Sequence, residues 1–356
     1  MINCPSSAAG LACRSIRQIV ATLILVLAMM PVAAAIQSSA VIIMYHRFGE
    51  SRYPTTNTTL EQLNAQIAEL KSGAYTVLPV AEIIDRLKAG KSLPDRAVGI
   101  TIDDAYQSIY RIAWPRFREA GLPFTVFVST GSVDQGLLSH LSWAQIREMQ
   151  ASGRVDIGQH TVSHLHMPSA DDPRIASELQ AASDTFDRQL GQVPQLFAYP
   201  YGESSQRISA AVRKAGFTAA FGQQSGVIGS IGDFYDLPRF AMNEKYGDMA
   251  RFRMALNALP LPVRDITPTD SLLADVNPPA IGFTLQLIQP DDGALACFTS
   301  HEGHADVERL GPSRVEVRVR QPFPTGRTRL NCTLPGPDGR WRWMGRQFLN
   351  LPDAIR

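Results

Sequence analysis

The chain has 356 residues and a formal net charge of +1, with 34 basic side chains against 33 acidic ones. This length exceeds that of one ordinary domain and predicts a sizeable core together with a smaller module. Basic and acidic residues are interspersed without long runs of one sign, which argues against nucleic acid or another polyanion as a partner.

Residues 1–35 have the features of a secretory signal. Two arginines precede an apolar run from Ile19 to Met30, and small residues lead up to Ala35. This order predicts export with cleavage near Ala35, giving a periplasmic or secreted protein. An uncleaved anchor is the alternative, because the apolar stretch is nearly long enough to span a membrane. The protein would then contact the membrane only through this segment.

From Val41 to about Phe240, short apolar runs alternate with amphipathic stretches. The stretches that begin at Thr59 (TLEQ) and Ser142 (SWAQ) fit capping boxes, and glycines stand where the helices should end. Repeated strand-then-helix units predict an α/β fold whose parallel sheet is closed or nearly closed into a barrel. Function is expected in the loops at the carboxyl ends of its strands. We assign residues 36–264 to this barrel.

The pattern changes after the barrel. Residues 265–280 are rich in proline and lack periodicity, which predicts a linker. Residues 281–356 contain alternating runs such as SRVEVRVR between turn residues, which predicts a small antiparallel, sandwich-like β module. Trp341 and Trp343 are two apart in this module. They either pack in its core, which is the favoured interpretation, or bind sugar rings.

The cysteines indicate an oxidising compartment. Removal of the signal would leave only Cys297 and Cys332. An even pair in an exported protein predicts a disulfide between them. The histidines of HEGH, residues 301–304, have no third ligand nearby and are interpreted as part of a polar loop.

Three groups of residues in the barrel have possible chemistry. Asp103 and Asp104 end the apolar run of ITIDDAY, where barrels place catalytic residues, although such a pair is more often a helix cap or a turn. His160 and His164 in GQHTVSHLH are four apart, so on a helical turn they would share one face and bind one metal; an exposed polar turn is the alternative. FAYPYG, ending at Gly202, is by propensity only a turn.

In this order, TIDD, HTVSH and YPYG resemble the first three motifs of the NodB-homology polysaccharide deacetylases, which form carbohydrate esterase family four. This family removes N-acetyl or O-acetyl groups from glycans. The resemblance covers about 200 residues and implies a distorted (β/α) barrel with zinc or another divalent ion. It implies that Asp104, His160 and His164 are the metal ligands and that Asp103 is the general base.

The same resemblance implies roles for the YPYG motif. Tyr199, Pro200 and Tyr201 would belong to the oxyanion and substrate pocket, with the backbone N–H of Tyr201 helping to hold the oxyanion. Chemical reasoning agrees with the ligand set, because two histidines and one carboxylate leave open positions on a metal. A second carboxylate beside the first stays free to accept a proton.

The proton donor is missing from its usual late position, since no Leu-x-His motif follows YPYG. The candidate is His46, at the end of the first strand in Met44-Tyr45-His46. This permuted order resembles the poly-N-acetylglucosamine deacetylases, because a closed barrel has no privileged first strand. A histidine satisfied by hydrogen bonds in the barrel wall is the alternative.

Two positions depart from the family pattern. The arginine that usually orients the base is replaced by Ala198, and Arg239 in DLPRF is expected to supply its charge beside Asp103. The tryptophan that usually lines the acetyl pocket is also absent from its place. The candidates to replace it are Tyr235, Leu237 and Phe240.

We therefore expect a metal-dependent enzyme that removes N-acetyl groups from an N-acetylglucosamine-containing polysaccharide of the cell envelope. One alternative is a non-catalytic glycan-binding or export protein on the same barrel, and another is an O-acetyl esterase of the xylan type. A degenerate barrel would have lost a ligand or the base. Both aspartates and both histidines are present, which favours an enzyme.

Overall fold

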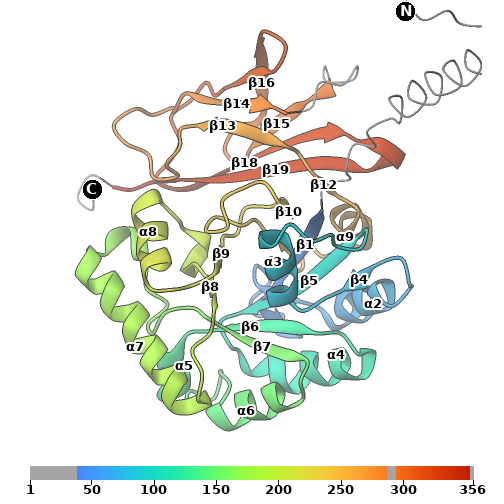
Figure 1. The fold of residues 1–356 in the computed structure, drawn as a ribbon, viewed down its shortest axis with the longest axis vertical. Helices are drawn as coiled ribbons and strands as arrows, with labels where there is room; N and C mark the ends of the chain where they lie inside the picture. The colour runs from blue at the N-terminus through green and yellow to red at the C-terminus, as the bar shows by residue number, and fades with distance from the viewer. Residues whose placement is uncertain (1–37, 287–293, 353–356) are drawn as a thin grey trace, which may run out of the picture. The chain divides into compact units, whose positions relative to one another are not determined.

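The computed structural model describes residues 38–286 and 294–352 (Figure 1). The signal predicted at residues 1–35 lies outside these ranges and stays a prediction. Within the described ranges, no helix is long and apolar enough to cross a membrane. Residues Ser38–Arg356 form one compact unit, which contains two large β-sheets.

The first sheet is the predicted barrel. Its strands are β1 (Ser39–Tyr45), β4 (Thr76–Val77), β5 (Ala97–Asp103), β6 (Phe124–Val128), β7 (Val155–Gln159), β8 (Leu196–Ala198), β9 (Ala219–Phe221), β10 (Val227–Gly229) and β11 (Phe240–Ala241). Six of them run parallel in the order β1, β5, β6, β7, β8, β9, and β10 lies antiparallel to β1. The carboxyl ends of these six strands therefore meet at one end of the barrel.

Helices connect the strands, as the alternating pattern predicted. They are α2 (Leu60–Leu70), α3 (Val80–Lys88), α4 (Trp114–Ala120), α5 (Thr130–Asp134), α6 (Trp143–Ala151), α7 (Asp172–Leu190), α8 (Gln206–Lys214) and α9 (Met249–Leu256). Both predicted capping boxes are confirmed, at Thr59 before α2 and at Ser142 before α6. A short parallel pair, β2 (Arg47–Phe48) and β3 (Asn57–Thr58), follows β1 at the carboxyl end of the barrel.

Residues 237–241 join the two ends of the parallel run. Leu237 forms a parallel bridge with Phe221 at the end of β9. Three residues later, β11 pairs in parallel with Ile43 and Met44 of β1. The segment thus bridges the last parallel strand to the first, which closes the barrel over this stretch and makes it the distorted (β/α) barrel that was predicted.

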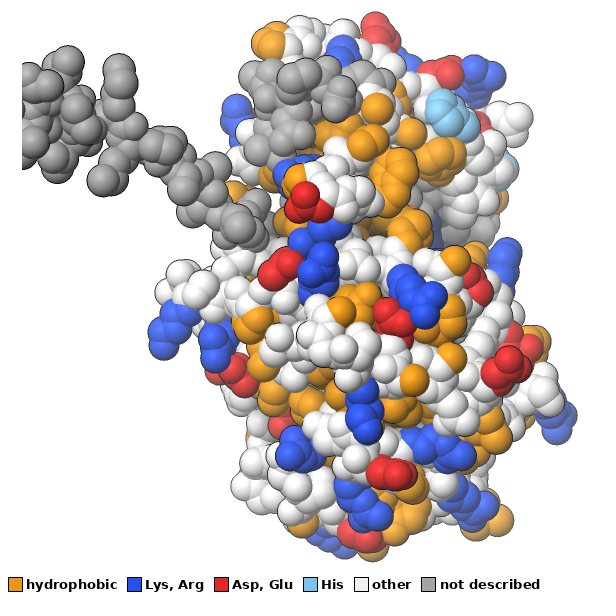
Figure 2. All heavy atoms as spheres, turned by 90° about the vertical axis from the view of Figure 1, so that its right-hand side faces the viewer, with side chains coloured by type: hydrophobic (Ala, Val, Ile, Leu, Met, Phe, Trp, Pro, Cys, Tyr) orange, Lys and Arg blue, Asp and Glu red, His pale blue; other side chains and the backbone are white. Residues whose placement is uncertain are grey.

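The barrel strands are buried along most of their length. All seven residues of β5 are buried, including the carboxylate of Asp103. Cover on both faces explains why parallel strands of this kind have nearly continuous apolar sequences. On the face of the molecule that Figure 2 displays, basic and acidic side chains are interspersed, with hydrophobic side chains between them.

The second sheet is the predicted antiparallel β module, except that its first strand in the chain pairs in parallel with its last. Its strands are β12 (Leu259–Pro260), β13 (Val263–Thr267), β14 (Ile281–Leu285), β15 (Ala296–Thr299), β16 (Gly303–Leu310), β17 (Arg314–Arg318), β18 (Gly326–Pro335) and β19 (Trp341–Asn350). They lie in the order β12, β19, β18, β15, β16, β17, β14, β13. The strand β12 lies before residue 265, and β13 runs across it. The sheet therefore begins before the predicted linker. The predicted domain division itself stays a prediction.

Cys297 of β15 and Cys332 of β18 lie directly opposite each other and form a disulfide. The two tryptophans of β19 have different surroundings, which the sequence did not predict. Trp343 packs on Phe240 of the barrel with 5.4 Å between the ring centres, whereas Trp341 is exposed. The favoured interpretation, that both tryptophans pack in the core of the module, is therefore wrong. Trp343 is half-buried against the core of the barrel, and Trp341 is exposed at the start of β19.

Candidate active site

Asp103 is the last residue of β5 and is completely buried. Arg239, also completely buried, donates to both of its carboxylate oxygens, from Nη1 to Oδ1 at 2.7 Å and from Nη2 to Oδ2 at 2.8 Å. Burial alone would raise the pKa of Asp103, but the charges of Arg239 and His46 lower it overall. The Asp103 carboxylate is therefore ionised at neutral pH and held in one orientation.

Asp104, His160 and His164 come together beside Asp103. Asp104 Oδ1 lies 3.4 Å from Nε2 of each histidine, and one ligand atom from each residue lies within 4.8 Å of the others. Asp104 Oδ1 and His160 Nε2 are buried without a hydrogen-bond partner among the described residues. Since buried polar atoms are normally satisfied, these orphaned donor atoms fit a divalent metal ion.

Both histidine rings turn Nε2 toward Asp104, but their pKa values shift in opposite directions. Burial lowers the pKa of His160, yet its close approach to Asp104 and the charges of Asp103 and Asp104 raise it overall. His160 Nδ1 donates to the carbonyl oxygen of Ala198 at 2.6 Å, which leaves Nε2 facing Asp104. Burial and the neighbouring His160 lower the pKa of His164 to about 4, so its ring is neutral at pH 7. Carbonyl contacts of this kind fix the ring orientation of metal-binding histidines.

The predicted helical turn that carries both histidines is wrong. β7 ends at Gln159, and the next helical residues are the short 3₁₀ turn Met167–Ser169. Thr161 and His164 instead adopt left-handed backbone angles, with φ of 64° and 55°. The loop nevertheless brings both rings to Asp104. The prediction that the two histidines lie together is therefore right, although a loop and not a helical turn brings them there.

Glu178 of α7 explains this loop. Its Oε2 accepts the backbone N–H groups of Val162 and Ser163 at 3.0 and 2.9 Å. These amides are thereby bound to a side chain instead of to helical carbonyls. His166 does not join the metal ligands, since its Nε2 lies 2.8 Å from Glu203.

The backbone of the site is strained. Eight non-glycine residues of the described ranges have positive φ, and five of them belong to or adjoin the three motifs: Asp104, Ala105, Thr161, His164 and Tyr201. Each such residue typically costs about 1–3 kcal/mol and persists only when its surroundings hold it. The backbone geometry of the site therefore lowers the stability of the fold, and contacts from the surrounding structure must offset this cost.

His46 follows β1 and lies beside the expected base. Its Nε2 is 3.9 Å from Asp103 Oδ2, and the side chain is mostly buried. It does not belong to the group of metal-ligating atoms formed by Asp104 and the two other histidines. The structure thus brings His46 to the place where the sequence analysis expected it, at the end of the first strand.

A cleft of about 770 Å³ opens over these residues. His46, Asp104, His164 and Tyr201 line it from the barrel, and Arg327 and Arg329 of β18 line it from the second sheet. The sequence analysis missed Tyr106 in this cleft. Burial, together with the charge of Asp104, raises the pKa of Tyr106 to about 12, and the guanidinium of Arg47 lies 3.3 Å from its ring centre.

Several residues expected in the substrate pocket lie elsewhere. Tyr199 is completely buried, and its hydroxyl donates to the carbonyl oxygen of Tyr235 at 2.8 Å, so it supports the YPYG turn from within the core. Pro200 is buried as well. The three proposed substitutes for the pocket tryptophan are also core residues: Tyr235, Leu237 and Phe240. Met44 and Met242 supply apolar surface to the cleft instead.

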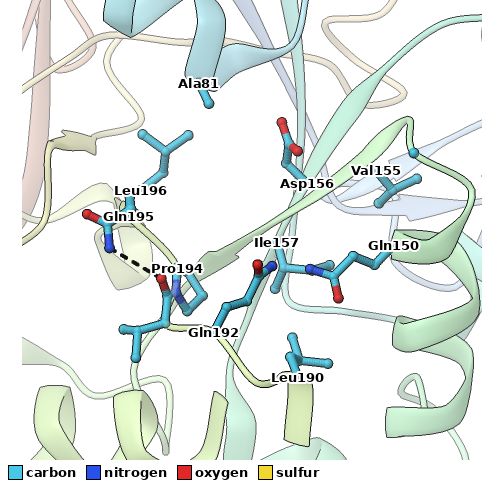
Figure 3. Close-up of a pocket in the computed structure, with 12 residues that line it drawn as sticks. Ala81, Gln150, Val155, Asp156, Ile157, Leu190, Gln192, Pro194, Gln195 and Leu196 are labelled. Atoms are coloured by element: carbon cyan, nitrogen blue, oxygen red, sulfur yellow. Dashed lines mark hydrogen bonds between the residues drawn. The ribbon is translucent and has the colours of Figure 1, made fainter. Parts of the chain in front are cut away.

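A second hollow, of about 460 Å³, lies at the amino ends of β7 and β8, away from the carboxyl ends that carry the cleft. Figure 3 shows Asp156, Gln192 and Gln195 around it. Its lining contains no histidine or cysteine among the described residues, and Asp156 is its one acidic side chain. It offers no set of metal ligands, which leaves the cleft over Asp104 as the candidate site.

Residues 90–220 match the family model of polysaccharide deacetylases. This matched stretch of the barrel is a polysaccharide deacetylase domain. YxkH of Bacillus subtilis strain 168 is 26% identical over 198 residues, which cover 56% of this chain and 69% of that protein. A poly-beta-1,6-N-acetyl-D-glucosamine N-deacetylase of Staphylococcus aureus strain MSSA476 is 24% identical over 234 residues, 58% of this chain and 80% of its own. The structure of IcaB from Ammonifex degensii resembles 62% of this chain and 97% of its own, with a TM-score of 0.55 and 26% identity.

Removal of one ligand should weaken metal binding by the deacetylase domain. We expect His164→Ala to lose more affinity for Zn²⁺ than the roughly 10- to 100-fold loss that follows alteration of an outer-shell partner. Titration of the metal-free protein followed by calorimetry would measure this loss. His166→Ala is the matched control, because His166 belongs to the same loop and faces Glu203. Equal Zn²⁺ affinity in His164→Ala and wild type would contradict the ligand assignment.

Proposed function

We propose that the deacetylase domain hydrolyses N-acetyl groups of an N-acetylglucosamine polysaccharide in the cell envelope. The observation that carries this proposal is that a buried carboxylate, a histidine and three side chains able to hold a metal lie together beside one cleft, which His46, Asp104 and His164 line. Amide hydrolysis needs a base, an acid and an electrophile in one place. The name of the Staphylococcus aureus relative supports a poly-N-acetylglucosamine substrate.

Asp104, His160 and His164 would hold the metal ion, for which we propose zinc because two imidazoles and one carboxylate form a common catalytic zinc set. When bound in such a site, the ion lowers the pKa of a water molecule and polarises a carbonyl oxygen. The cleft leaves room for a sugar beside these ligands, since His164 and Asp104 both line it.

Asp103 is the proposed general base. Arg239 occupies both of its oxygens and prevents rotation of the carboxylate, while Oδ2 also faces His46. Because the pKa of Asp103 lies below its ordinary value, the group is ionised and ready to accept the proton of the attacking water. That proton can then pass toward His46, which lies 3.9 Å away.

His46 is the proposed general acid, and the backbone N–H of Tyr201 the proposed oxyanion donor. His46 lines the cleft next to Asp103 and can give its proton to the departing nitrogen. The Tyr201 ring packs against His164 with 4.4 Å between ring centres, which places this turn beside the metal ligands. An N–H aimed at the developing oxyanion stabilises the transition state.

We further propose that the protein is exported to the periplasm or secreted after loss of residues 1–35. The disulfide between Cys297 and Cys332 supports an oxidising compartment. Residues 36–264 would then form the catalytic domain, 265–280 the connection and 281–356 the β module.

Incubation of the zinc-loaded protein with β-1,6-linked N-acetylglucosamine oligosaccharides tests the proposal directly. We expect release of acetate and appearance of free amines, and we expect Asp103→Asn to lower turnover by about 10²- to 10⁴-fold, because it replaces the base. O-acetylated xylan oligosaccharides, tested in parallel, separate the amidase from an esterase. Release of acetate from xylan alone would contradict the proposed substrate.

Loss of His46 should separate proton donation from metal binding. We expect His46→Ala to keep its full zinc content yet to lose about 10²- to 10⁴-fold in amide turnover. An acetate ester should suffer less, because its alkoxide leaving group depends less on protonation than an amine does. Zinc content by mass spectrometry and turnover of matched amide and ester substrates give the comparison. Unchanged amide hydrolysis would remove His46 from the mechanism.

A further inference from the structure

We propose that the β18–β19 hairpin of the second sheet holds the YPYG turn, residues Tyr199 to Gly202, in its active geometry, with Gln347 and Arg327 as positioning residues. This proposal rests on the proposed function in one respect, because the proposed function assigns the oxyanion donor to this turn. It assigns a catalytic purpose to the second sheet.

Two successive carbonyl groups of the turn accept hydrogen bonds from the hairpin. Gln347 of β19 donates from Nε2 to the carbonyl oxygen of Gly202 at 2.9 Å, in a buried position. Arg327 of β18 donates from Nη1 to the carbonyl oxygen of Tyr201, also at 2.9 Å. Because each carbonyl belongs to a rigid peptide plane, the two bonds fix the orientation of two consecutive peptide units.

The turn needs such support. Tyr201 has φ of 61°, a left-handed conformation that is unfavourable for a residue with a side chain. Gly202 also has positive φ, and a Cβ there would lie 2.5 Å from the backbone nitrogen of Gln223. Within the turn, the N–H of Gly202 bonds to the carbonyl of Tyr199 at 2.8 Å. The Tyr201 N–H belongs to the same peptide plane as the Pro200 carbonyl, which accepts from the Glu203 N–H at 3.2 Å. The two bonds from the hairpin hold the next two planes, so rotation at the strained Tyr201 is opposed on both sides of this residue.

The hairpin is itself fastened to the barrel near these contacts. Gly345 of β19 runs so close to Ser225 that a Cβ at Gly345 would overlap the Ser225 carbonyl oxygen. Ser225 Oγ donates to Asn331 of β18 at 2.7 Å, and Trp343 donates from Nε1 to Ser225 Oγ at 3.2 Å. The hairpin therefore presents Gln347 and Arg327 from a fixed position, and Figure 1 shows β18 and β19 as the long strands beside the barrel.

The two donors differ in a way that makes the proposal testable. Gln347 is buried and does not line the cleft, although its Oε1 accepts from Nε of the cleft residue Arg329 at 3.4 Å. Its loss therefore removes no group that would contact the substrate directly. Arg327 lines the cleft and can also contact substrate. A positioning role for Gln347 therefore predicts a lower kcat with little change in KM, since the oxyanion donor acts in the transition state.

The test uses Gln347→Met, which keeps the length of the side chain and removes the donor. We expect backbone hydrogen exchange to accelerate in peptides that span residues 199–203, with the rest of the chain unchanged. We expect kcat for amide hydrolysis to fall about 10- to 100-fold, because a misplaced group costs on the order of 10²-fold. The KM and zinc content should stay within twofold of wild type.

Arg327→Lys and Arg327→Met form a second pair, in which lysine should preserve more of the exchange protection because it retains a donor. Arg318→Met is the matched control, since Arg318 is an arginine of the same sheet that pairs with Glu308 and Glu316. It should change neither the exchange nor the turnover.

Unchanged hydrogen exchange of the turn in Gln347→Met and Arg327→Met would overturn the proposal, whatever the activity. Faster exchange with unchanged kcat would overturn the positioning role. Absence of amide hydrolysis by wild type would instead refute the proposed function, and the exchange experiment would still decide whether the hairpin holds the turn.

Discussion

The rest of the structure depends on the buried ion pair between Arg239 and Asp103. Both side chains are completely withdrawn from water, and Arg239 also donates from Nε to the carbonyl oxygen of Gly222 at 2.9 Å. Removal of one partner from a buried pair typically costs about 3–5 kcal/mol, because the other charge stays uncompensated. Arg239 lies in the segment that bridges β9 to β1. The segment whose backbone pairings close the barrel therefore also supplies the side chain that orients Asp103.

Around this pair, contacts from distant segments of the chain fix the backbone and side chains of the site. Glu178 of α7 binds the amides of the histidine loop, and the carbonyl of Ala198 orients the His160 ring. Gln347 reaches the YPYG turn from the second sheet. The contacts of Glu178 and Gln347 stabilise loops that contain left-handed residues, and the Ala198 carbonyl orients a side chain. The precision of the site therefore comes from the surrounding fold and not from the motifs alone.

The sequence predicted what local patterns encode. Apolar runs and capping boxes located the barrel strands and two helices, and the order of the three motifs located Asp104, His160 and His164. The prediction of a helical turn after β7 was wrong because the Glu178 carboxylate accepts the N–H groups of Val162 and Ser163. The roles of Gln347 and Arg327 had no sequence signal, since they depend on contacts across 145 and 126 residues. Arg239 was predicted only because Ala198 stands where the resembling family has an arginine, so another residue had to supply that charge.

A double-mutant cycle of unfolding free energies at positions 239 and 103 tests most directly whether the stability of the fold depends on this pair. Arg239→Met should destabilise the protein by about 3–5 kcal/mol, since Asp103 is left buried and unpaired. Addition of Asp103→Asn to that variant should recover part of the loss, because the stranded charge is removed. Urea unfolding that shows simply additive losses, with the double variant less stable than Arg239→Met by the full cost of Asp103→Asn, would contradict the account.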